Sequence, residues 1–197
     1  MLSTSRLNIL PLSYSELFRY LTARDQLAWD LDFIPFDYPM ECTEERAIRF
    51  ERLPKIKNNP DKYYYYTIWL IIHKFSKKMI GSICMHGIPD KKGQVEIGYS
   101  TGPEFRNQGF MTETLKVFID WTGKRRDIRA IVAETDVDNC ASMKVLEKCG
   151  FVITEEVEGK VYWRLPVKKR KQKKLFFPAL MISASFSNLI PEIVSSF

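Results

Sequence analysis

The chain has 197 residues, of which 45% are hydrophobic, and its formal net charge is +6. This length supports one well-packed domain and is too short for two of ordinary size. The charge lies mainly at the end, because residues 166–197 hold six basic side chains and one acidic side chain, which leaves about +1 on residues 1–165. Charge therefore does not indicate a nucleic-acid-binding body, and we expect no nucleic-acid partner.

The cysteines and histidines show neither a C-x-x-C pair nor a metal-ligand spacing. They are Cys42, Cys84, Cys140, Cys149, His73 and His86. Without a recognisable secretory signal, we expect reduced thiols, no bound metal and a cytoplasmic protein. The sequence has no uninterrupted run of about 18 apolar residues, so it predicts no membrane-spanning helix.

The first half of the chain predicts two helices and the start of a sheet. Residues 7–12 form a short strand, and Ser13 with Glu16 begins a helix with a cap and an acidic first turn. Residues 43–56 form a second helix capped at Thr43, with residues 47, 50 and 53 on one stripe. Residues 63–73 are aromatic and β-branched and predict a central strand. Residues 79–85 form the next strand, and the turn at 90–93 leads into a strand that holds Glu96.

The rest of the chain is organised around residues 94–115. An alternating strand breaks at Gly102, passes through a polar loop and opens into an amphipathic helix near Gly109, with Met111, Leu115 and Phe118 on one face. The first-turn N–H groups of a helix lack intrahelical partners, and the helix dipole is positive there, so this arrangement predicts a phosphate or pyrophosphate site. Neither a G-x-G-x-x-G nor a G-x-x-x-x-G-K-[ST] motif is present.

The following elements complete a crossover. Residues 128–133 predict a strand parallel to the one before the loop. A short helix follows, with Asp136, Asp138 or Asn139 as its cap and Gly150 at its end, and Cys149 on its apolar side is interpreted as a small core residue. Residues 151–157 and 160–165 predict a closing hairpin.

Two motifs in this order resemble a known family. Residues 106–111 read Arg-Asn-Gln-Gly-Phe-Met, an Arg/Gln-x-x-Gly-x-small pattern with Met in the last place, and residues 138–151 supply the second motif. Together they resemble the acetyl-CoA loop and following helix of the GNAT acyltransferases, in the wording of the RimJ/RimL-like branch. The likeness covers residues 1–165, about five-sixths of the chain, and is strongest over residues 94–151.

This resemblance implies an α/β (α+β) protein with the GNAT fold. We expect a mostly antiparallel mixed sheet, with a parallel pair at the acetyl-CoA site and helices on both faces. The acetyltransferase domain would occupy residues 1–165. The tail, residues 166–197, has no assigned role: its basic run is a solvated segment, an anchor on an anionic surface, a partner-docking strand or an accidental extension of the reading frame.

The family also implies which residues bind acetyl-CoA, the acetyl donor. Backbone amides of residues 108–112 would meet the pyrophosphate, Gly109 would allow close approach, Arg106 would add charge, and an N–H in residues 97–99 would meet the developing oxyanion. The full predicted set is Ile97, Gly98, Tyr99, Arg106, Asn107, Gln108, Gly109, Phe110, Met111, Thr112, Asn139 and Ser142.

The catalytic residues predicted from the resemblance are Glu96 and Ser142. Glu96 would accept the proton of the amine, directly or through water. The alternatives are that Glu96 is a solvated strand residue or that Glu134 or Asp136 is the base.

Many members carry a tyrosine four residues before the glycine that ends the second helix, but this chain has Leu146 there. Ser142 would instead hydrogen-bond the thiol or the pantetheine arm. Alternatively, Ser142 and Asn139 only cap the helix. A mechanism in which Cys140 carries the acetyl group covalently has little support, because no histidine lies near Cys140 in the sequence.

We therefore predict an N-acetyltransferase that moves an acetyl group from acetyl-CoA to a primary amine by direct attack in a ternary complex. The acceptor is a small amine or a peptide N-terminus, and the protein is a monomer or a homodimer. The alternative is a non-catalytic acyl-CoA-binding or sensing module. In this family the region corresponding to residues 29–39 borders the acceptor; here Trp29, Phe33, Phe36 and Tyr38 either do so or only cover the core.

Overall fold

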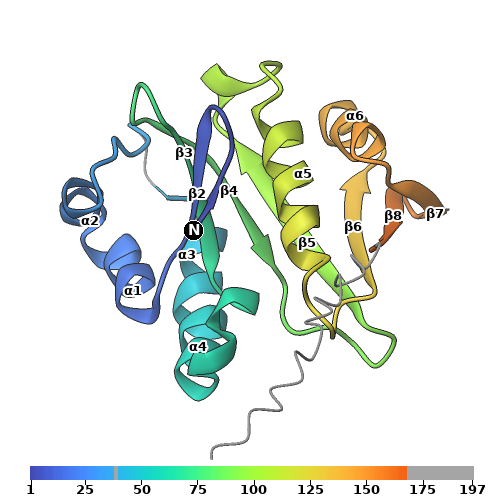
Figure 1. Ribbon diagram of the computed structural model, residues 1–197, viewed down its shortest axis with the longest axis horizontal. Coiled ribbons are helices and arrows are strands. Elements are labelled where there is room, and N and C mark those ends of the chain that lie inside the picture. The colour runs from blue at the N-terminus through green and yellow to red at the C-terminus, as the bar shows by residue number, and fades with distance from the viewer. Residues whose placement is uncertain (38–39, 168–197) are drawn as a thin grey trace, which may run out of the picture.

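The computed structural model describes residues 1–37 and 40–167. Tyr38 and the tail from residue 168 onward lie outside the described residues, so the predictions made for them stay predictions. Within the described part, eight strands form one sheet in the order β1-β2-β3-β4-β5-β6-β8-β7 (Figure 1). The strands are β1 Leu2–Ser3, β2 Leu7–Pro11, β3 Ile68–His73, β4 Met79–Met85, β5 Gln94–Thr101, β6 Ala130–Asp136, β7 Val152–Val157 and β8 Lys160–Pro166.

Helices connect these strands. They are α1 Tyr14–Thr22, α2 Arg24–Asp30, α3 Cys42–Ala47, α4 Leu53–Asn58, α5 Phe110–Thr122 and α6 Cys140–Lys148, with a π-helical segment η1 Ile48–Arg52 and 3-10 turns η2 Pro60–Tyr65 and η3 Pro103–Phe105. The Ser13 hydroxyl accepts a hydrogen bond from the Glu16 N–H, and Glu16 reaches back to Ser13 N–H, which confirms the predicted capping box at α1.

One parallel pair interrupts an otherwise antiparallel sheet. β5 and β6 are parallel and pair over only three positions, from Gln94↔Ala130 to Glu96↔Val132. Beyond Glu96 the ladder between these two strands ends, although β5 continues to Thr101. The predicted mixed sheet with a parallel pair beside the loop is confirmed.

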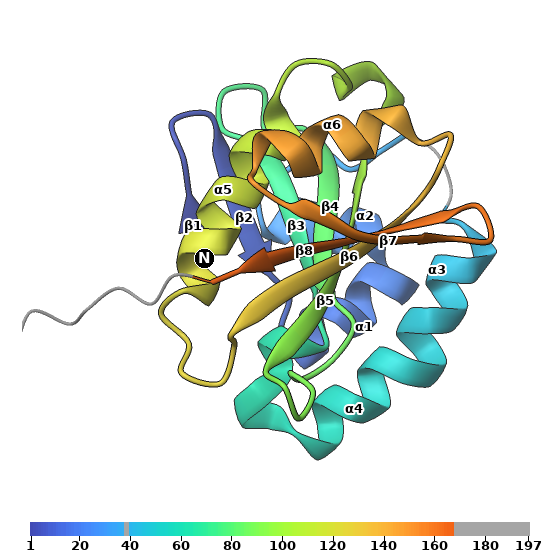
Figure 2. The same ribbon diagram turned by 90° about the vertical axis from the view of Figure 1, so that its right-hand side faces the viewer.

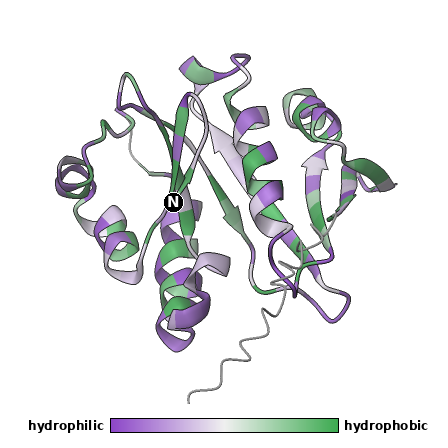
Figure 3. Cartoon of the chain, in the orientation of Figure 1, coloured by the Kyte–Doolittle hydropathy of each residue, from purple (hydrophilic) through white to green (hydrophobic). Residues whose placement is uncertain are grey.

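The two faces of the sheet carry separate apolar clusters. In β3, Trp69 and Ile71 pack into the cluster beneath α5 and α6, whereas Leu70 and Ile72 pack with α1, α2 and the α3–α4 segment. This period-2 alternation lets one strand serve two cores. Helices lie on both faces, as predicted (Figures 1 and 2), and they alternate between hydrophobic and hydrophilic residues (Figure 3).

The central strand is shorter than predicted. Residues 63–65 belong to the turn η2, and β3 begins only at Ile68. Tyr65 is buried and its hydroxyl donates to the Asp127 carboxylate, while Tyr64 packs edge-on against Trp121 of α5. These tyrosines therefore pack around one end of α5 instead of alternating across a sheet, a tertiary arrangement that β-propensity does not encode.

The predicted helix over residues 43–56 was wrong at its start and in its buried stripe. The helix begins at Cys42 without a side-chain cap, so Thr43 lies inside it, and Phe50 is 69% exposed. The buried side chains are Ile48, Leu53 and Ile56. The π-helical segment inserts an extra residue into the turn and shifts the phase of the stripe, and Pro54, which has no N–H, follows it.

Two aromatic residues of the segment 29–37 differ in position. Phe33 is buried in the core, whereas the Trp29 side chain is 83% exposed. Phe36 lies close to Gly102, where the loop after β5 begins. Among residues 1–37 and 40–167, no helix is long and apolar enough to cross a membrane.

Candidate functional site

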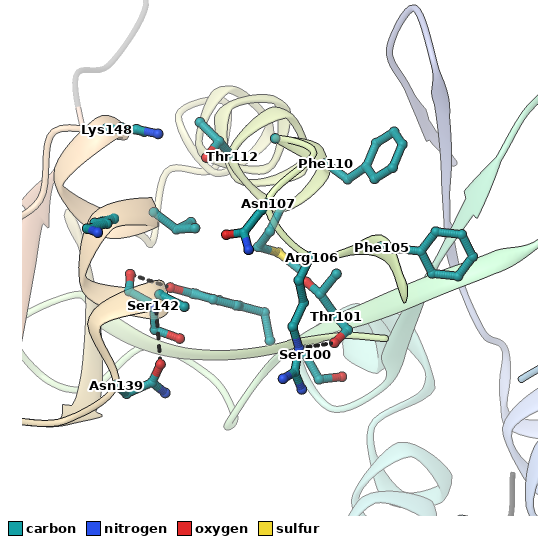
Figure 4. Close-up of a pocket in the computed structure, with 16 residues that line it drawn as sticks. Ser100, Thr101, Phe105, Arg106, Asn107, Phe110, Thr112, Asn139, Ser142 and Lys148 are labelled. Atoms are coloured by element: carbon teal, nitrogen blue, oxygen red, sulfur yellow. Dashed lines mark hydrogen bonds between the residues drawn. The ribbon is translucent and has the colours of Figure 1, made fainter. Parts of the chain in front are cut away.

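A cavity of about 510 Å³ opens between the end of β5, the loop before α5, the first turn of α5 and one side of α6. Figure 4 shows Arg106, Asn107 and Thr112 near one side of it and Asn139, Ser142 and Lys148 on the other. Its lining consists of Tyr99, Ser100, Thr101, Phe105, Arg106, Asn107, Gly109, Phe110, Met111, Thr112, Asn139, Ala141, Ser142, Lys144, Val145 and Lys148.

The backbone at the start of α5 provides hydrogen-bond donors to this cavity. Gly109 is the N-cap, has a φ of 77° and offers no side chain to the first turn. The N–H groups that follow therefore lack a capping side chain, at the positive end of a 13-residue helix. An anion is the ligand that such a helix end binds best.

Arg6, which the sequence analysis did not predict, holds the loop before α5 in place. Its Nη1 donates to the Gln108 carbonyl at 3.2 Å, its Nη2 lies 2.6 Å from Glu113 Oε2, and its guanidinium stacks over the Phe110 ring. Burial raises the pKa of Glu113, but hydrogen bonds from Thr4 and Arg6 outweigh it and hold that pKa below its usual range. The loop is thus held by an ion pair formed across 107 residues of sequence.

The opposite wall is the first turn of α6. Asn139 Oδ1 accepts a hydrogen bond from the Ser142 N–H at 3.1 Å, so Asn139 caps this helix. The Tyr99 hydroxyl donates to the Ser142 carbonyl at 3.2 Å, and burial raises the pKa of Tyr99 to about 12. Tyr99 therefore stays protonated at neutral pH and ties β5 to α6 across the cavity.

The structure brings most of the predicted donor-binding residues to the cavity. Those that line it are Tyr99, Arg106, Asn107, Gly109, Phe110, Met111, Thr112, Asn139 and Ser142. Three others do not. Ile97 is buried in the core, Gly98 faces the other side of the sheet toward His86, and the Gln108 side chain turns back to donate to the Glu104 carbonyl at 2.8 Å.

Two cations in the lining were not predicted. Lys144 and Lys148 lie one helical turn apart on α6 and add positive charge opposite Arg106. The spacing of four residues was visible in the sequence, but exposed lysines at this spacing are common on solvated helix faces. Only the packing of α6 beside α5 makes them part of the site.

Glu96 lies outside this cavity, on the opposite face of β5. Its neighbours Val95 and Ile97 are buried beneath α5, whereas Glu96 is exposed, as alternation predicts. Glu96 Oε1 lies 3.1 Å from Nδ1 of His86. The rivals Glu134 and Asp136 both form ion pairs with Lys160, at 3.1 and 2.7 Å.

Comparison with known proteins shows which family this chain resembles. Residues 6–152 match the family model described as the acetyltransferase (GNAT) domain. The chain is 32% identical over 117 residues to the uncharacterized N-acetyltransferase YjdG of Bacillus subtilis, covering 59% of this chain and 68% of that protein. It is also 32% identical over 83 residues to YoaA of Bacillus subtilis, covering 42% of this chain and 47% of YoaA.

Solved structures share the fold. RimL, a ribosomal L7/L12 alpha-N-protein acetyltransferase in complex with coenzyme A, aligns with a TM-score of 0.59 and 20% identity over 85% of this chain and 97% of that one. The ribosomal-protein-S5-alanine acetyltransferase of Vibrio fischeri aligns with a TM-score of 0.59 and 19% identity, over 87% and 98% of the two chains.

The chain therefore belongs to the GNAT acetyltransferase family. It is an acetyl-CoA-dependent acetyltransferase by class. The predicted family is confirmed, and the predicted likeness to the RimJ/RimL-like branch is confirmed at the level of the fold.

Proposed function

We propose that this protein transfers the acetyl group of acetyl-CoA to a primary amine by direct attack within a ternary complex. The observation that carries the proposal is the uncapped start of α5 at Gly109, which opens into a cavity lined by basic side chains. A pyrophosphate matches both features, because it combines charge with several hydrogen-bond acceptors.

The lining offers groups that could hold two parts of the donor, the pyrophosphate and the thiol arm. Backbone N–H groups of Phe110, Met111 and Thr112 would hold the pyrophosphate, with Arg106 and the α6 lysines adding charge around it. Main-chain donors explain why Met111 is tolerated where a small residue is usual. When bound, acetyl-CoA supplies an activated thioester. The Ser142 hydroxyl would hydrogen-bond its thiol or pantetheine arm.

The amine would approach from the opposite face of β5, where Glu96 lies. An α-amino group has a pKa near 8 and a lysine amine a pKa of about 10.4, so both need help to lose a proton at neutral pH. Glu96 would accept that proton directly or through water. A backbone N–H among residues 97–99 would hydrogen-bond the developing oxyanion, since β5 has no β6 partner beyond Glu96.

Peptide N-termini are the first acceptors to test. Two solved proteins with this fold are named for acetylation of ribosomal protein residues, one of them at an alpha-amino group. Small primary amines are the second class of acceptor to test.

The test is release of coenzyme A thiol from acetyl-CoA against a panel of N-terminal peptides and small amines. Turnover of any amine supports the proposal and begins to define the acceptor. Tight acetyl-CoA binding with no turnover across the panel would contradict transfer to these amines. That result would favour the alternative role of an acyl-CoA-binding or sensing module.

A further inference from the structure

Four polar side chains gather on the face of β4 and β5 that points away from the donor cavity. We call them the thiol cluster: Arg52, Cys84, His86 and Glu96. Cys84 lies directly across the ladder from Gly98. His86 follows β4 and hydrogen-bonds the Glu96 main-chain carbonyl through its N–H, at 3.0 Å. Strand register alone thus brings the thiol, the imidazole and the carboxylate together.

Arg52 completes the cluster from the π-helical segment. Its Nη2 lies 3.1 Å from Cys84 Sγ, and its Nη1 donates to the carbonyls of Tyr66 and Met85 at 2.9 and 3.2 Å. Two carbonyls on separate segments therefore fix the guanidinium beside the sulfur. π-helical turns inside α-helices occur frequently at functional sites, and this one directs a cation at a thiol.

The thiol, the imidazole and the carboxylate follow one another as in an activated cysteine nucleophile. The His86 imidazole lies close enough to the Cys84 thiol to lower its pKa, and His86 Nδ1 lies 3.1 Å from Glu96 Oε1. A nucleophile beside a base, with the base oriented by a third group, is the signature of covalent catalysis. Burial raises the pKa of Cys84, but His86 and Arg52 outweigh it and lower that pKa overall. The neighbouring Cys84 thiol and Glu96 carboxylate raise the pKa of His86.

Gly98 lies against this thiol, and the cluster fills the space that a side chain at position 98 would need. A Cβ at position 98 would lie 2.9 Å from His86 Nε2 and 3.7 Å from Cys84 Sγ, so a side chain there would collide with the imidazole. The next residue, Tyr99, lines the donor cavity on the other face. Cys84 therefore lies beside the stretch of β5 where the acetyl carbonyl is proposed to bind.

The other half-buried cysteine of the described chain lacks these features. Burial raises the pKa of Cys149 to about 11, and its sulfur lies 3.7 Å from the Thr112 carbonyl. Cys140, the thiol considered from the sequence, is exposed at the start of α6, on a different element from both histidines. Cys84, and not Cys140, has beside it the histidine that an acyl-cysteine intermediate requires.

We propose that Cys84 is a covalent acetyl acceptor within the protein, which takes the acetyl group when no amine is bound beside the donor. Its thiolate attacks the thioester carbonyl of bound acetyl-CoA, a new carbon–sulfur bond forms at Sγ, and the bond to the coenzyme A sulfur breaks. The leaving thiolate takes the bond's electron pair and then a proton from the His86 imidazolium. The product is an acetyl-thioester on Cys84 and free coenzyme A. This inference rests on the proposed donor site.

The experiment incubates the full chain with acetyl-CoA in the absence of any amine, followed by peptide mass spectrometry under acidic quench. We expect one acetyl group on Cys84 that neutral hydroxylamine removes, since hydroxylamine cleaves thioesters and spares amides. Cys84→Ala should lose this label, whereas Cys42→Ser, which changes an exposed thiol outside the cluster, should keep it. His86→Asn should slow labelling by about a hundredfold.

Calorimetric titration of coenzyme A separates two ways of failing. Coenzyme A binding without acetyl on Cys84 overturns the inference and leaves the donor site intact, while absence of binding overturns both. A second readout needs no donor: the ultraviolet thiolate absorbance of wild type minus Cys84→Ala should titrate below the ordinary cysteine value of about 8.5. A midpoint at or above that value would overturn the inference, and Glu96→Gln and Arg52→Gln should each move it upward.

Discussion

The two faces of β5 present sites built in different ways. The donor cavity is made by stretches that are nearly continuous in sequence, residues 99–112 and 139–148. The thiol cluster is made by four residues, from the end of β4, from β5 and from the π-helical segment, and strand pairing and the π-helical turn bring them together. Local motifs therefore reveal the first site, and only the folded chain reveals the second.

Glu96→Gln should have the largest effect, and it should act on one face only. Because glutamine keeps the shape but cannot accept the proton, we expect kcat to fall by about 10²-fold or more. The affinity for coenzyme A should not change, since Glu96 lies outside the cavity. The measurements are thiol-release kinetics across pH and calorimetry.

Glu156→Gln, on the exposed edge strand β7, is the matched control and should retain the wild-type rate. A Glu96→Gln rate equal to wild type at every pH would remove Glu96 as the base. It would also remove the reason for placing the amine on this face.

Removing the positive charges of α6 should weaken coenzyme A binding, the property that Glu96→Gln is expected to leave unchanged. In the double variant Lys144→Gln, Lys148→Gln we expect about tenfold weaker coenzyme A binding, since each cation at a phosphate contributes about 1 kcal/mol or less at an exposed site. The salt dependence of binding should become shallower. Lys116→Gln, an exposed α5 residue outside the lining, is the control. Unchanged affinity in the double variant would place the phosphates elsewhere.

Loss of the α6 cap should have a smaller effect on stability. Asn139→Ala removes the acceptor for the Ser142 N–H and should lower the free energy of unfolding by about 1 kcal/mol. Urea denaturation measures this change. Asp138→Ala, one residue earlier, should change stability by about 0.5 kcal/mol or less if Asn139 alone caps the helix. Equal losses in both variants would contradict that assignment.

The smallest predicted effect is the pH dependence of the ion pair between Arg6 and Glu113. The folded-state pKa of Glu113 lies below its ordinary value of 4.5, so its stabilising contribution is present above that pH and is lost as pH falls through the folded-state pKa. We expect wild type to be more stable than Glu113→Gln at pH 7, with the difference shrinking below pH 4.5. A difference independent of pH would mean that packing, not charge, accounts for it.

Sequence reasoning succeeded where a feature depends on neighbouring residues. The capping box at Ser13, the turn at Gly93 and the left-handed Gly150 after α6 all follow from local backbone chemistry. The loop around Gly109 was found for the same reason, because its donors are main-chain groups at a helix start.

Reasoning from sequence failed where tertiary contacts decide the outcome. The π-helical segment turned Phe50 outward and Arg52 inward, and no local pattern marks that shift. Tyr65 left the predicted strand to donate a hydrogen bond to Asp127, 62 residues away. His86 is separated from Glu96 by a turn, so their contact follows from the register of β4 and β5.

The most direct test of the central claim compares coenzyme A with pantetheine in calorimetric titrations of the purified protein. Pantetheine keeps the thiol arm but lacks the pyrophosphate, so a site centred on the first turn of α5 should bind coenzyme A and acetyl-CoA and bind pantetheine far more weakly. Equal affinities, or no binding of any of the three, would contradict the assignment of this cavity to the acetyl donor.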